Sequence, residues 1–138
     1  MEIILWRHAD AEAGADDLAR KLTPLGEKEA AAMAKWLRAH LPPAFTLLAS
    51  PAVRAQQTAA ALQAPLTEKT LAPGASVTAI RKAAEKHEGL VIVVGHQPDL
   101  GRAAAQFAGA GGEWHVEKGA IVWFAGPRLK ALLSPDLL

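Results

Sequence analysis

The chain has 138 residues, the size of one ordinary domain, so we expect a single domain over residues 1–138. Its 15 Lys and Arg residues against 14 Asp and Glu residues give a net charge of +1, which argues against the basic surface needed for general binding to nucleic acid or membranes. The absence of Cys excludes disulfides, thiol catalysis and cysteine-ligated metal centres. No apolar run has the length of a membrane span or signal peptide, and we expect a cytoplasmic protein.

The chain begins with an apolar run, followed by a loop and a helix. Residues 3–6 favour a strand buried on both faces, because the run is rich in β-formers and does not alternate. The polar, glycine-containing residues 9–21 are typical of a surface loop. Thr23 and Pro24 supply an N-cap and a first-turn proline, so we predict a helix that ends at Pro42. This helix is expected to cover one face of a sheet.

A second strand and two further helices follow. Residues 45–49 form another short apolar run, and Ser50 with the proline after it predicts the cap and first turn of a helix to about residue 63. Residues 65–74 are turn-like. Apolar residues at helical spacing between residues 77 and 87 predict a third amphipathic helix.

Residues 90–94 give the clearest strand, because five β-favouring apolar residues without alternation are typical of a central parallel strand. We predict a helix from Pro98 to about residue 108, and then a C-terminal hairpin of residues 120–124 and 129–133. Strands that alternate with helices imply right-handed crossovers between parallel strands. The expected fold class is α/β: a three-layer α/β/α sandwich with a mostly parallel central sheet and a C-terminal hairpin.

Basic side chains follow three of the predicted strands. Arg7 and His8 come after the first strand, Arg54 lies one turn into the helix after the second, and His96 follows the third. In open α/β sheets, ligands bind beyond the carboxyl ends of the parallel strands. We therefore expect two guanidinium and two imidazole groups to meet in one pocket. Because the guanidinium fork matches two phosphate oxygens, a phosphoryl group is the expected ligand.

The same residues predict a reaction. Two nearby arginines favour the neutral form of His8, and neutral imidazole is a nucleophile. The hypothesis is that one ring nitrogen of His8 attacks phosphorus in line and that water then hydrolyses the phosphohistidine. Arg7, Arg54 and a protonated or hydrogen-donating His96 would neutralise the phosphoryl oxygens, so neither a metal nor another cofactor is expected. Ser50 is interpreted chiefly as a helix cap, with a secondary role beside the phosphate.

Four segments of the chain together resemble the histidine phosphatase superfamily. In chain order they read RHAD at residues 7–10, RKLTPLG at 20–26, SPAVRAQQT at 50–58 and VGHQP at 94–98. The short chain and its Pro-Gly-Ala turn at residues 73–75 resemble the SixA-like phosphohistidine phosphatase branch.

The resemblance implies a phosphoglycerate mutase-like fold and a function for each matching residue. His8 would be the phosphorylated nucleophile, and Arg7, Arg54 and His96 would form the phosphate pocket. Arg20 would make a further contact on the substrate side, where its alternative is a surface ion pair with the neighbouring aspartates. The implied substrate is phosphohistidine on a protein, such as a phosphotransfer domain.

The sequence departs from the superfamily pattern at two places. Ala9 stands where the superfamily usually has Gly after the histidine, which makes a positive φ less accessible. Larger relatives use a carboxylic acid to protonate the leaving oxygen, and Asp10, Glu12 and Glu68 are candidates by loop position alone. Imidazole leaves readily once it is protonated, so the missing acid favours phosphohistidine as substrate.

Two alternative functions stay open at this point. A phosphorylated small molecule would be the substrate of a phosphomonoesterase, which predicts a carboxyl group such as Glu68 beside the leaving oxygen. A phosphate-binding module without turnover is the other alternative, and the intact His8 argues against it.

Overall fold

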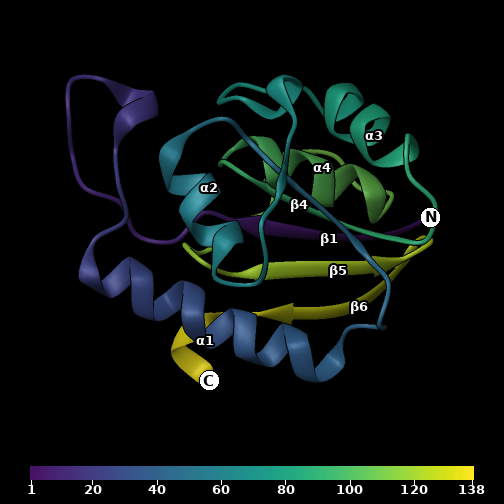
Figure 1. The fold of residues 1–138 in the computed structure, drawn as a ribbon. Coiled ribbons are helices and arrows are strands. Elements are labelled where there is room, and N and C mark those ends of the chain that lie inside the picture. The colour runs from purple at the N-terminus through teal and green to yellow at the C-terminus, as the bar shows by residue number, and fades with distance from the viewer.

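A six-stranded sheet runs through the middle of the computed structural model, which describes residues 1–138 (Figure 1). The spatial order is β3-β2-β4-β1-β5-β6; the first four strands are parallel, and β5 and β6 form an antiparallel hairpin beside β1. The expected fold class is therefore confirmed. The strands are β1 (Glu2–Arg7), β2 (Thr46–Ala49), β3 (Leu66–Thr67), β4 (Leu90–Gly95), β5 (Ile121–Ala125) and β6 (Arg128–Leu133).

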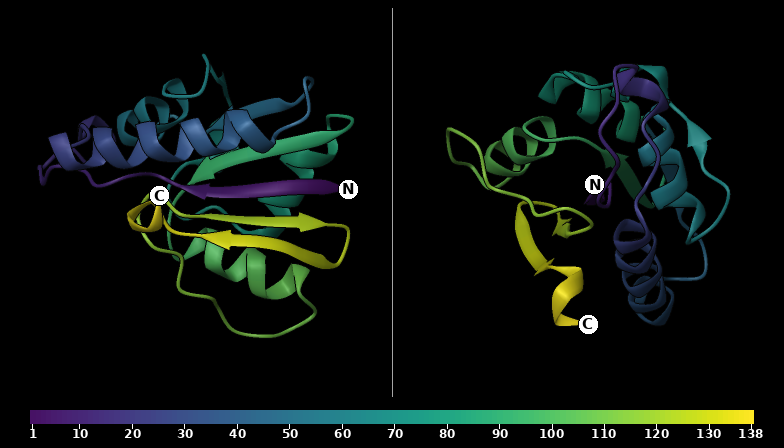
Figure 2. Two further views of the ribbon diagram at one scale, coloured as in Figure 1. Left: turned by 90° about the horizontal axis from the view of Figure 1, so that it is seen from below. Right: turned by 90° about the vertical axis from the view of Figure 1, so that its left-hand side faces the viewer.

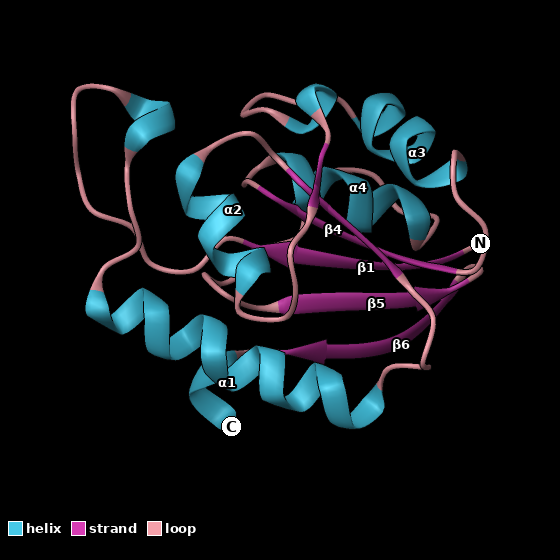
Figure 3. Ribbon diagram, in the orientation of Figure 1, coloured by secondary structure: helices cyan, strands magenta, loops and turns pink.

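Helices cover both faces of this sheet (Figures 2 and 3). The side chains of α1 and α2 pack on one face, and those of α3 and α4 pack on the other. None of these helices combines the length and the apolar character of a membrane span. Their bounds are α1 (Pro24–His40), α2 (Val53–Ala60), α3 (Val77–Glu85) and α4 (Asp99–Phe107).

The central strands contribute to two apolar clusters at once. In β1, Ile3 and Leu5 pack toward α3 and α4, whereas Ile4 and Trp6 pack toward α1 and α2. All six residues of β4 are buried as well. Successive side chains of a strand point to opposite faces, so a strand covered on both sides requires the unbroken apolar runs seen in the sequence.

The start of α1 fixes the loop that follows β1. The side chain of Thr23 accepts a hydrogen bond from the backbone of Gly26 at 3.0 Å, and Pro24 occupies the first turn, as predicted. A Cβ on Gly26 would come within 2.0 Å of the carbonyl oxygen of Asp10. Only glycine permits this close approach, which holds the chain beyond β1 against the helix.

The beginning of α2 differs from the prediction. The helix starts at Val53 and ends at Ala60, and no side chain caps its first turn. The hydroxyl of Ser50 instead accepts a hydrogen bond from the backbone of Ala52 at 3.2 Å, inside the turn that precedes the helix. Ser50 is therefore not the helix cap, because its hydroxyl serves the turn and the site described below.

Among the short elements that were not predicted are β3 and a 3-10 turn. The strand β3 has only two residues, both exposed, at the edge of the sheet. A strand this short has no periodicity for the sequence to display. The 3-10 turn η1 (Asp17–Ala19) interrupts the predicted loop and lies against α2.

Candidate active site

The carboxyl ends of three neighbouring strands bring the predicted residues together. The backbone N–H of His8 donates to the carbonyl of Gly95 at 3.0 Å, and that of Ser50 donates to the carbonyl of Val94 at 3.0 Å. The parallel pairing thus continues one residue past the strands. His8, Ser50 and His96 consequently start side by side at one edge of the sheet.

The ring of His8 is buried and held in one tautomer. Its Nδ1 lies 2.7 Å from the carbonyl oxygen of Ala9. A carbonyl oxygen only accepts hydrogen bonds, so Nδ1 carries the proton and Nε2 keeps its lone pair. Burial lowers the pKa of His8 from 6.5 to about 4, against the effect of the Ala9 carbonyl, and the charges of Arg54 and Arg7 lower this pKa further. At neutral pH the ring is uncharged, and its Nε2 carries a free lone pair.

His96 lies beside it, with 5.3 Å between the two ring centroids. Its Nε2 is 2.7 Å from the hydroxyl oxygen of Ser50, and its Nδ1 is buried without a hydrogen-bond partner. Burial, followed by the charge of Arg54, lowers the pKa of His96 from 6.5 to about 3. His96 is therefore neutral at physiological pH in the ligand-free protein.

Arg54 reaches the site from the first turn of α2 and is 4% exposed. Its Nη1 donates to the carbonyl of Asp17 at 2.6 Å, and its Nη2 donates to the carboxylate of the same residue at 3.2 Å. Its Nε is buried without a partner. The sequence did not indicate this pairing, because 37 residues separate Asp17 from Arg54.

Arg20 forms the ion pair that was the alternative to a substrate contact. Its Nη1 lies 3.0 Å from the carboxylate of Asp17, and its Nε donates to the carbonyl of Glu12 at 2.7 Å. Asp17 thus links Arg20 to Arg54. The charge of Arg20 still acts on the site, since it contributes to the lowered pKa of His8.

Arg7 completes the cluster from the end of β1. Its Nη1 donates to the carbonyl of Val116 at 2.9 Å, while its Nε is buried without a partner. Burial lowers the pKa of Arg7 from its usual value, and the carboxylates of Glu117 and Glu29 oppose that shift. The guanidinium is thus held by the loop before β5, and its buried Nε is left free.

Unsatisfied polar atoms occur only in this cluster. In the whole chain, the buried side-chain nitrogen and oxygen atoms without a partner are Arg7 Nε, Arg54 Nε and His96 Nδ1. A buried donor left unpaired costs about 1–3 kcal/mol, so three of them around one ring are costly without a ligand. Their chemistry fits an oxygen-rich anion.

Thr58 holds two parts of the site together, a role that the sequence did not predict. Its buried hydroxyl donates to the carbonyl of Arg54 at 2.8 Å and accepts from the backbone of Ala9 at 3.0 Å. It therefore joins the turn that carries Arg54 to the residue after His8. Its position four residues after Arg54, within a segment that carries the family resemblance, was the available signal.

Ala9 is accommodated without strain. No residue other than glycine has a positive φ, so the backbone at Ala9 is ordinary. Its buried methyl group packs with Leu22 and Ala30. Alanine in this position thus contributes to a small apolar cluster.

Two of the three candidate proton donors, Asp10 and Glu68, are engaged elsewhere, and the third, Glu12, is exposed on the loop after β1. Hydrogen bonds to Lys118 and Lys86 lower the pKa values of Asp10 and Glu68, respectively, and the hydrogen bond from Arg20 lowers that of Asp17. These carboxyl groups are ionised at neutral pH. No group of three His, Cys, Asp or Glu side chains is arranged to hold a metal ion.

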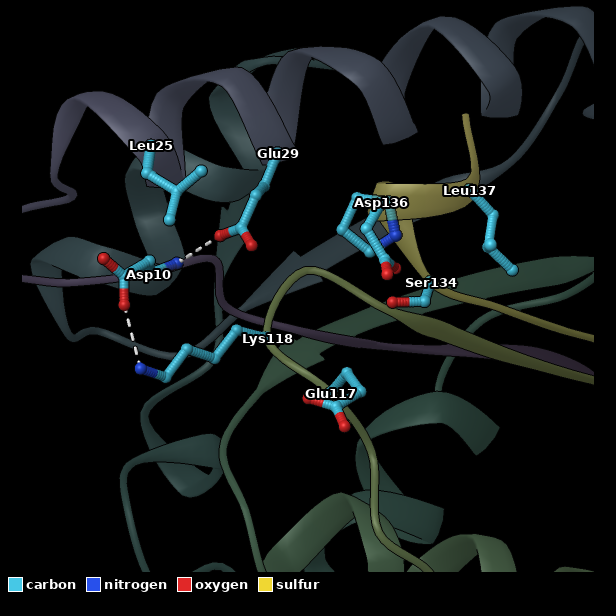
Figure 4. A pocket seen from close by; sticks show the side chains of 9 residues that line it. Asp10, Leu25, Glu29, Glu117, Lys118, Ser134, Asp136 and Leu137 are labelled. Atoms are coloured by element: carbon cyan, nitrogen blue, oxygen red, sulfur yellow. Dashed lines mark hydrogen bonds and ion pairs between the residues drawn. The ribbon is translucent and has the colours of Figure 1, made fainter.

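A cavity of about 570 Å³ adjoins the site through Asp10 (Figure 4). It lies between α1, the loop before β5 and the C-terminal turn η3 (Pro135–Leu137). Asp10 and Lys118, which line the cavity, pair at 2.8 Å (Figure 4), and Leu25 and Leu137, which also line it, are 59% and 76% exposed.

Comparisons with known proteins identify the family to which this fold belongs. Residues 3–72 match the family model of the histidine phosphatase superfamily (branch 1). An uncharacterised protein of Picosynechococcus sp. is 34% identical to this chain over an alignment 137 residues long. The alignment covers 88% of this chain and 83% of that protein.

Solved structures resemble the whole fold. The protein histidine phosphatase SixA complexed with tungstate superposes with a TM-score of 0.84 at 25% identity, over 99% of both chains. A SixA chain from Nakamurella multipartitia superposes with a TM-score of 0.81 at 25% identity, over 97% of this chain and 95% of its own. With its SixA-like fold and its family match over residues 3–72, this chain belongs to branch 1 of the histidine phosphatase superfamily.

Proposed function

We propose that this chain is a metal-independent phosphatase that hydrolyses phosphohistidine on a protein through a covalent phosphohistidine on His8. The family match and the likeness to SixA support phosphatase activity. The observation that carries the specific site is the set of unpaired buried nitrogens of Arg7, Arg54 and His96 around the neutral ring of His8.

Phosphoryl binding follows from these free donors. The Nε atoms of Arg7 and Arg54 donate to two phosphoryl oxygens, and His96 Nδ1 donates to a third. At about 4 Å and an effective dielectric near 20, each arginine attracts an oxyanion by about 4 kcal/mol before desolvation. Two permanent cations therefore hold a dianion without a metal ion. The tungstate in the SixA structure is a tetrahedral oxyanion of the same shape.

In the first step Nε2 of His8 forms a bond to phosphorus while the bond from phosphorus to the substrate ring breaks. A substrate ring protonated on its distal nitrogen departs as neutral imidazole, so no acid of the enzyme is required. The proton stays on Nδ1 of His8, and its hydrogen bond to the carbonyl of Ala9 stabilises the positive charge of the phosphorylated ring.

In the second step water attacks phosphorus and the bond to His8 breaks. Because Nδ1 already carries a proton, His8 leaves as neutral imidazole. The protons of the water end on the new phosphate ion and solvent. The same hydrogen bond to Ala9 thus serves both steps.

The carboxyl groups favour phosphohistidine over a phosphate ester. An alkoxide leaving group requires a proton, whereas Asp10 and Glu68 are held ionised by Lys118 and Lys86. The small-molecule phosphomonoesterase is therefore less well supported, because Glu68 was its expected acid.

The surroundings of the site favour a substrate carried by a protein. The cavity that Asp10 lines is open, and the exposed side chains of Leu25 and Leu137 offer apolar contacts in its lining. Exposed apolar side chains beside a site are typical of protein contact surfaces. The SixA structure is described as that of a protein histidine phosphatase, which agrees with this substrate class.

The test uses a phosphohistidine peptide and p-nitrophenyl phosphate, each with and without EDTA. We expect the peptide to be hydrolysed at an unchanged rate in EDTA, and the ester to be hydrolysed slowly or not at all. His8→Ala should abolish hydrolysis, whereas the control His87→Ala should not, because His87 lies outside the site. Comparable hydrolysis of both compounds would favour the phosphomonoesterase, and hydrolysis of neither would favour the phosphate-binding module.

A further inference from the structure

The hydroxyl group of Ser50 lies at the junction of the turn before α2 and the second histidine. Ser50 is fully buried at the carboxyl end of β2. Its oxygen accepts a hydrogen bond from the backbone of Ala52 at 3.2 Å and lies 2.7 Å from Nε2 of His96. The contact with Ala52 would be enough to close the turn, so the contact with His96 indicates a second role for this hydroxyl group.

The count of hydrogens decides the direction of the second contact. A hydroxyl group has one hydrogen and two lone pairs, and the backbone of Ala52 occupies one lone pair. If Nε2 of His96 donated to Ser50, the hydroxyl hydrogen would have no acceptor, because the oxygen has no other partner. If Ser50 donates to Nε2, every hydrogen and lone pair of the contact is used. A neutral imidazole with a bare Nε2 carries its proton on Nδ1.

We propose that Ser50 is a positioning residue that fixes neutral His96 with its proton on Nδ1, so that the free nitrogen of this ring is a hydrogen-bond donor to the phosphoryl group. This inference rests on the proposed function for its purpose, but the tautomer itself is a property of the free protein. Without the hydroxyl, Nδ1 could equally present a lone pair, which repels phosphoryl oxygens.

The two neighbouring imidazoles then have complementary roles. The carbonyl of Ala9 ties up the Nδ1 proton of His8 and leaves the lone pair on Nε2 free to attack. The hydroxyl of Ser50 ties up the Nε2 lone pair of His96 and leaves the Nδ1 proton free to donate. Two uncharged rings with centroids 5.3 Å apart are thereby distinguished as nucleophile and donor.

The test reads the His96 tautomer by NMR of the full chain labelled with ¹⁵N-histidine, at neutral pH and without ligand. We expect the wild-type proton on Nδ1 and a mixture of tautomers in Ser50→Ala. For turnover of the phosphohistidine peptide, kcat of Ser50→Ala should fall about 10- to 100-fold with a smaller change in KM, as for other residues that orient a catalytic group. Ser50→Thr keeps a hydroxyl group and should restore both the tautomer and most of kcat.

Ser76→Ala is the matched control. The hydroxyl of Ser76 also accepts a backbone hydrogen bond, from Ala79 at 3.0 Å, but it lies at the start of α3 away from the histidines. Loss of such a contact alone should lower stability and leave kcat and the His96 tautomer unchanged. If Ser50→Ala behaves in the same way, the inference is wrong.

The wild-type spectrum alone also decides the question if Ser50→Ala does not fold. A proton on Nε2 of His96 would overturn the proposal, and a proton on Nδ1 would support it. Failure of the proposed function is distinguishable, because a chain that hydrolyses no phosphohistidine still reports its tautomer. The affinities of wild type and Ser50→Thr for orthovanadate then measure, without turnover, how well Nδ1 of His96 donates to an oxyanion. A marked loss of affinity in Ser50→Thr with an unchanged tautomer would count against the proposal.

Discussion

Two helices that start at the same edge of the sheet each bury a charged side chain in the first turn. On α4, Asp99 is 3% exposed, and its Oδ2 accepts from the backbones of Gly74 and Ala75 at 2.9 and 3.0 Å. On α2, Arg54 is 4% exposed, and it retains an unpaired Nε. Burial alone therefore does not identify a site.

Satisfaction of hydrogen bonds separates the two. The carboxylate of Asp99 holds a surface turn against α4, and neither of its oxygens is buried without a partner. Arg54 is held by Asp17 through Nη1 and Nη2, and its buried Nε has no partner within the protein. The comparison predicts that changes at Arg54 affect activity and that changes at Asp99 affect stability.

The largest expected effect is that of Arg54→Lys. Lysine keeps the charge but has neither the fork nor the Nε donor, so kcat/KM for the phosphohistidine peptide should fall by about 10²–10³. The free energy of unfolding in urea should change by less than about 1 kcal/mol, because the removal of a buried unpaired donor offsets the loss of the hydrogen bonds to Asp17. Arg102→Lys on α4, outside the site, is the control. An unchanged kcat/KM in Arg54→Lys would mean that Arg54, like Asp99, has only a structural role.

The second prediction concerns acid. The folded-state pKa values of His8 and His96 are about 4 and about 3, against 6.5 for the free side chain. The unfolded chain therefore binds more protons below pH 6.5, and stability is lost as pH falls from 6.5 toward 4. For His8 this loss is about 3 kcal/mol. Urea unfolding at several pH values should show the decline, and His8→Asn should flatten it; equal slopes in both proteins would contradict the assignment.

Asp99→Ala should have the opposite profile to Arg54→Lys. It leaves the backbone N–H groups of Gly74 and Ala75 without their acceptor, which should cost about 2 kcal/mol of folding free energy. The kcat of the folded variant should stay within about twofold of wild type, since Asp99 contacts none of the phosphate-binding groups. Thermal unfolding and peptide hydrolysis measure the two quantities, and a loss of kcat without a loss of stability would place Asp99 in the site.

Much of the fold was predictable because burial is periodic. The unbroken apolar runs of β1 and β4 indicate strands covered on both faces, and Thr23 with Pro24 marks the start of α1. The C-terminal hairpin also forms as predicted, from Ile121–Ala125 and Arg128–Leu133. Each of these signals depends on residues close together in the chain.

The polar contacts of the site were harder to predict because they join distant residues. Whether Asp17 meets Arg54 depends on the path of an irregular loop, which has no periodicity. The proline after Ser50 predicts that its hydroxyl caps a helix, whereas in the structure this hydroxyl contacts His96, which is 46 residues away. Convergence of the main residues was predictable only because parallel strands end at one edge.

The smallest expected effect is that of Asp17→Asn, which tests how much of the positive charge of Arg54 is offset by a carboxylate of the protein itself. The carboxylate lies 3.2 Å from Nη2 of Arg54 and offsets part of the positive charge that attracts a phosphoryl group. Its side chain is 55% exposed, so its loss should change the free energy of unfolding by less than about 1 kcal/mol. Asparagine keeps an acceptor oxygen but removes the charge, and we expect inorganic phosphate to bind about two- to fivefold more tightly, most clearly at low ionic strength. Calorimetric titration measures this affinity, with Asp16→Asn as the neighbouring control that has no bond to Arg54. Weaker binding of phosphate in Asp17→Asn would mean that the ion pair holds Arg54 in its binding orientation. The contacts of Arg54 within the protein would then matter more for phosphate binding than its unpaired Nε indicates.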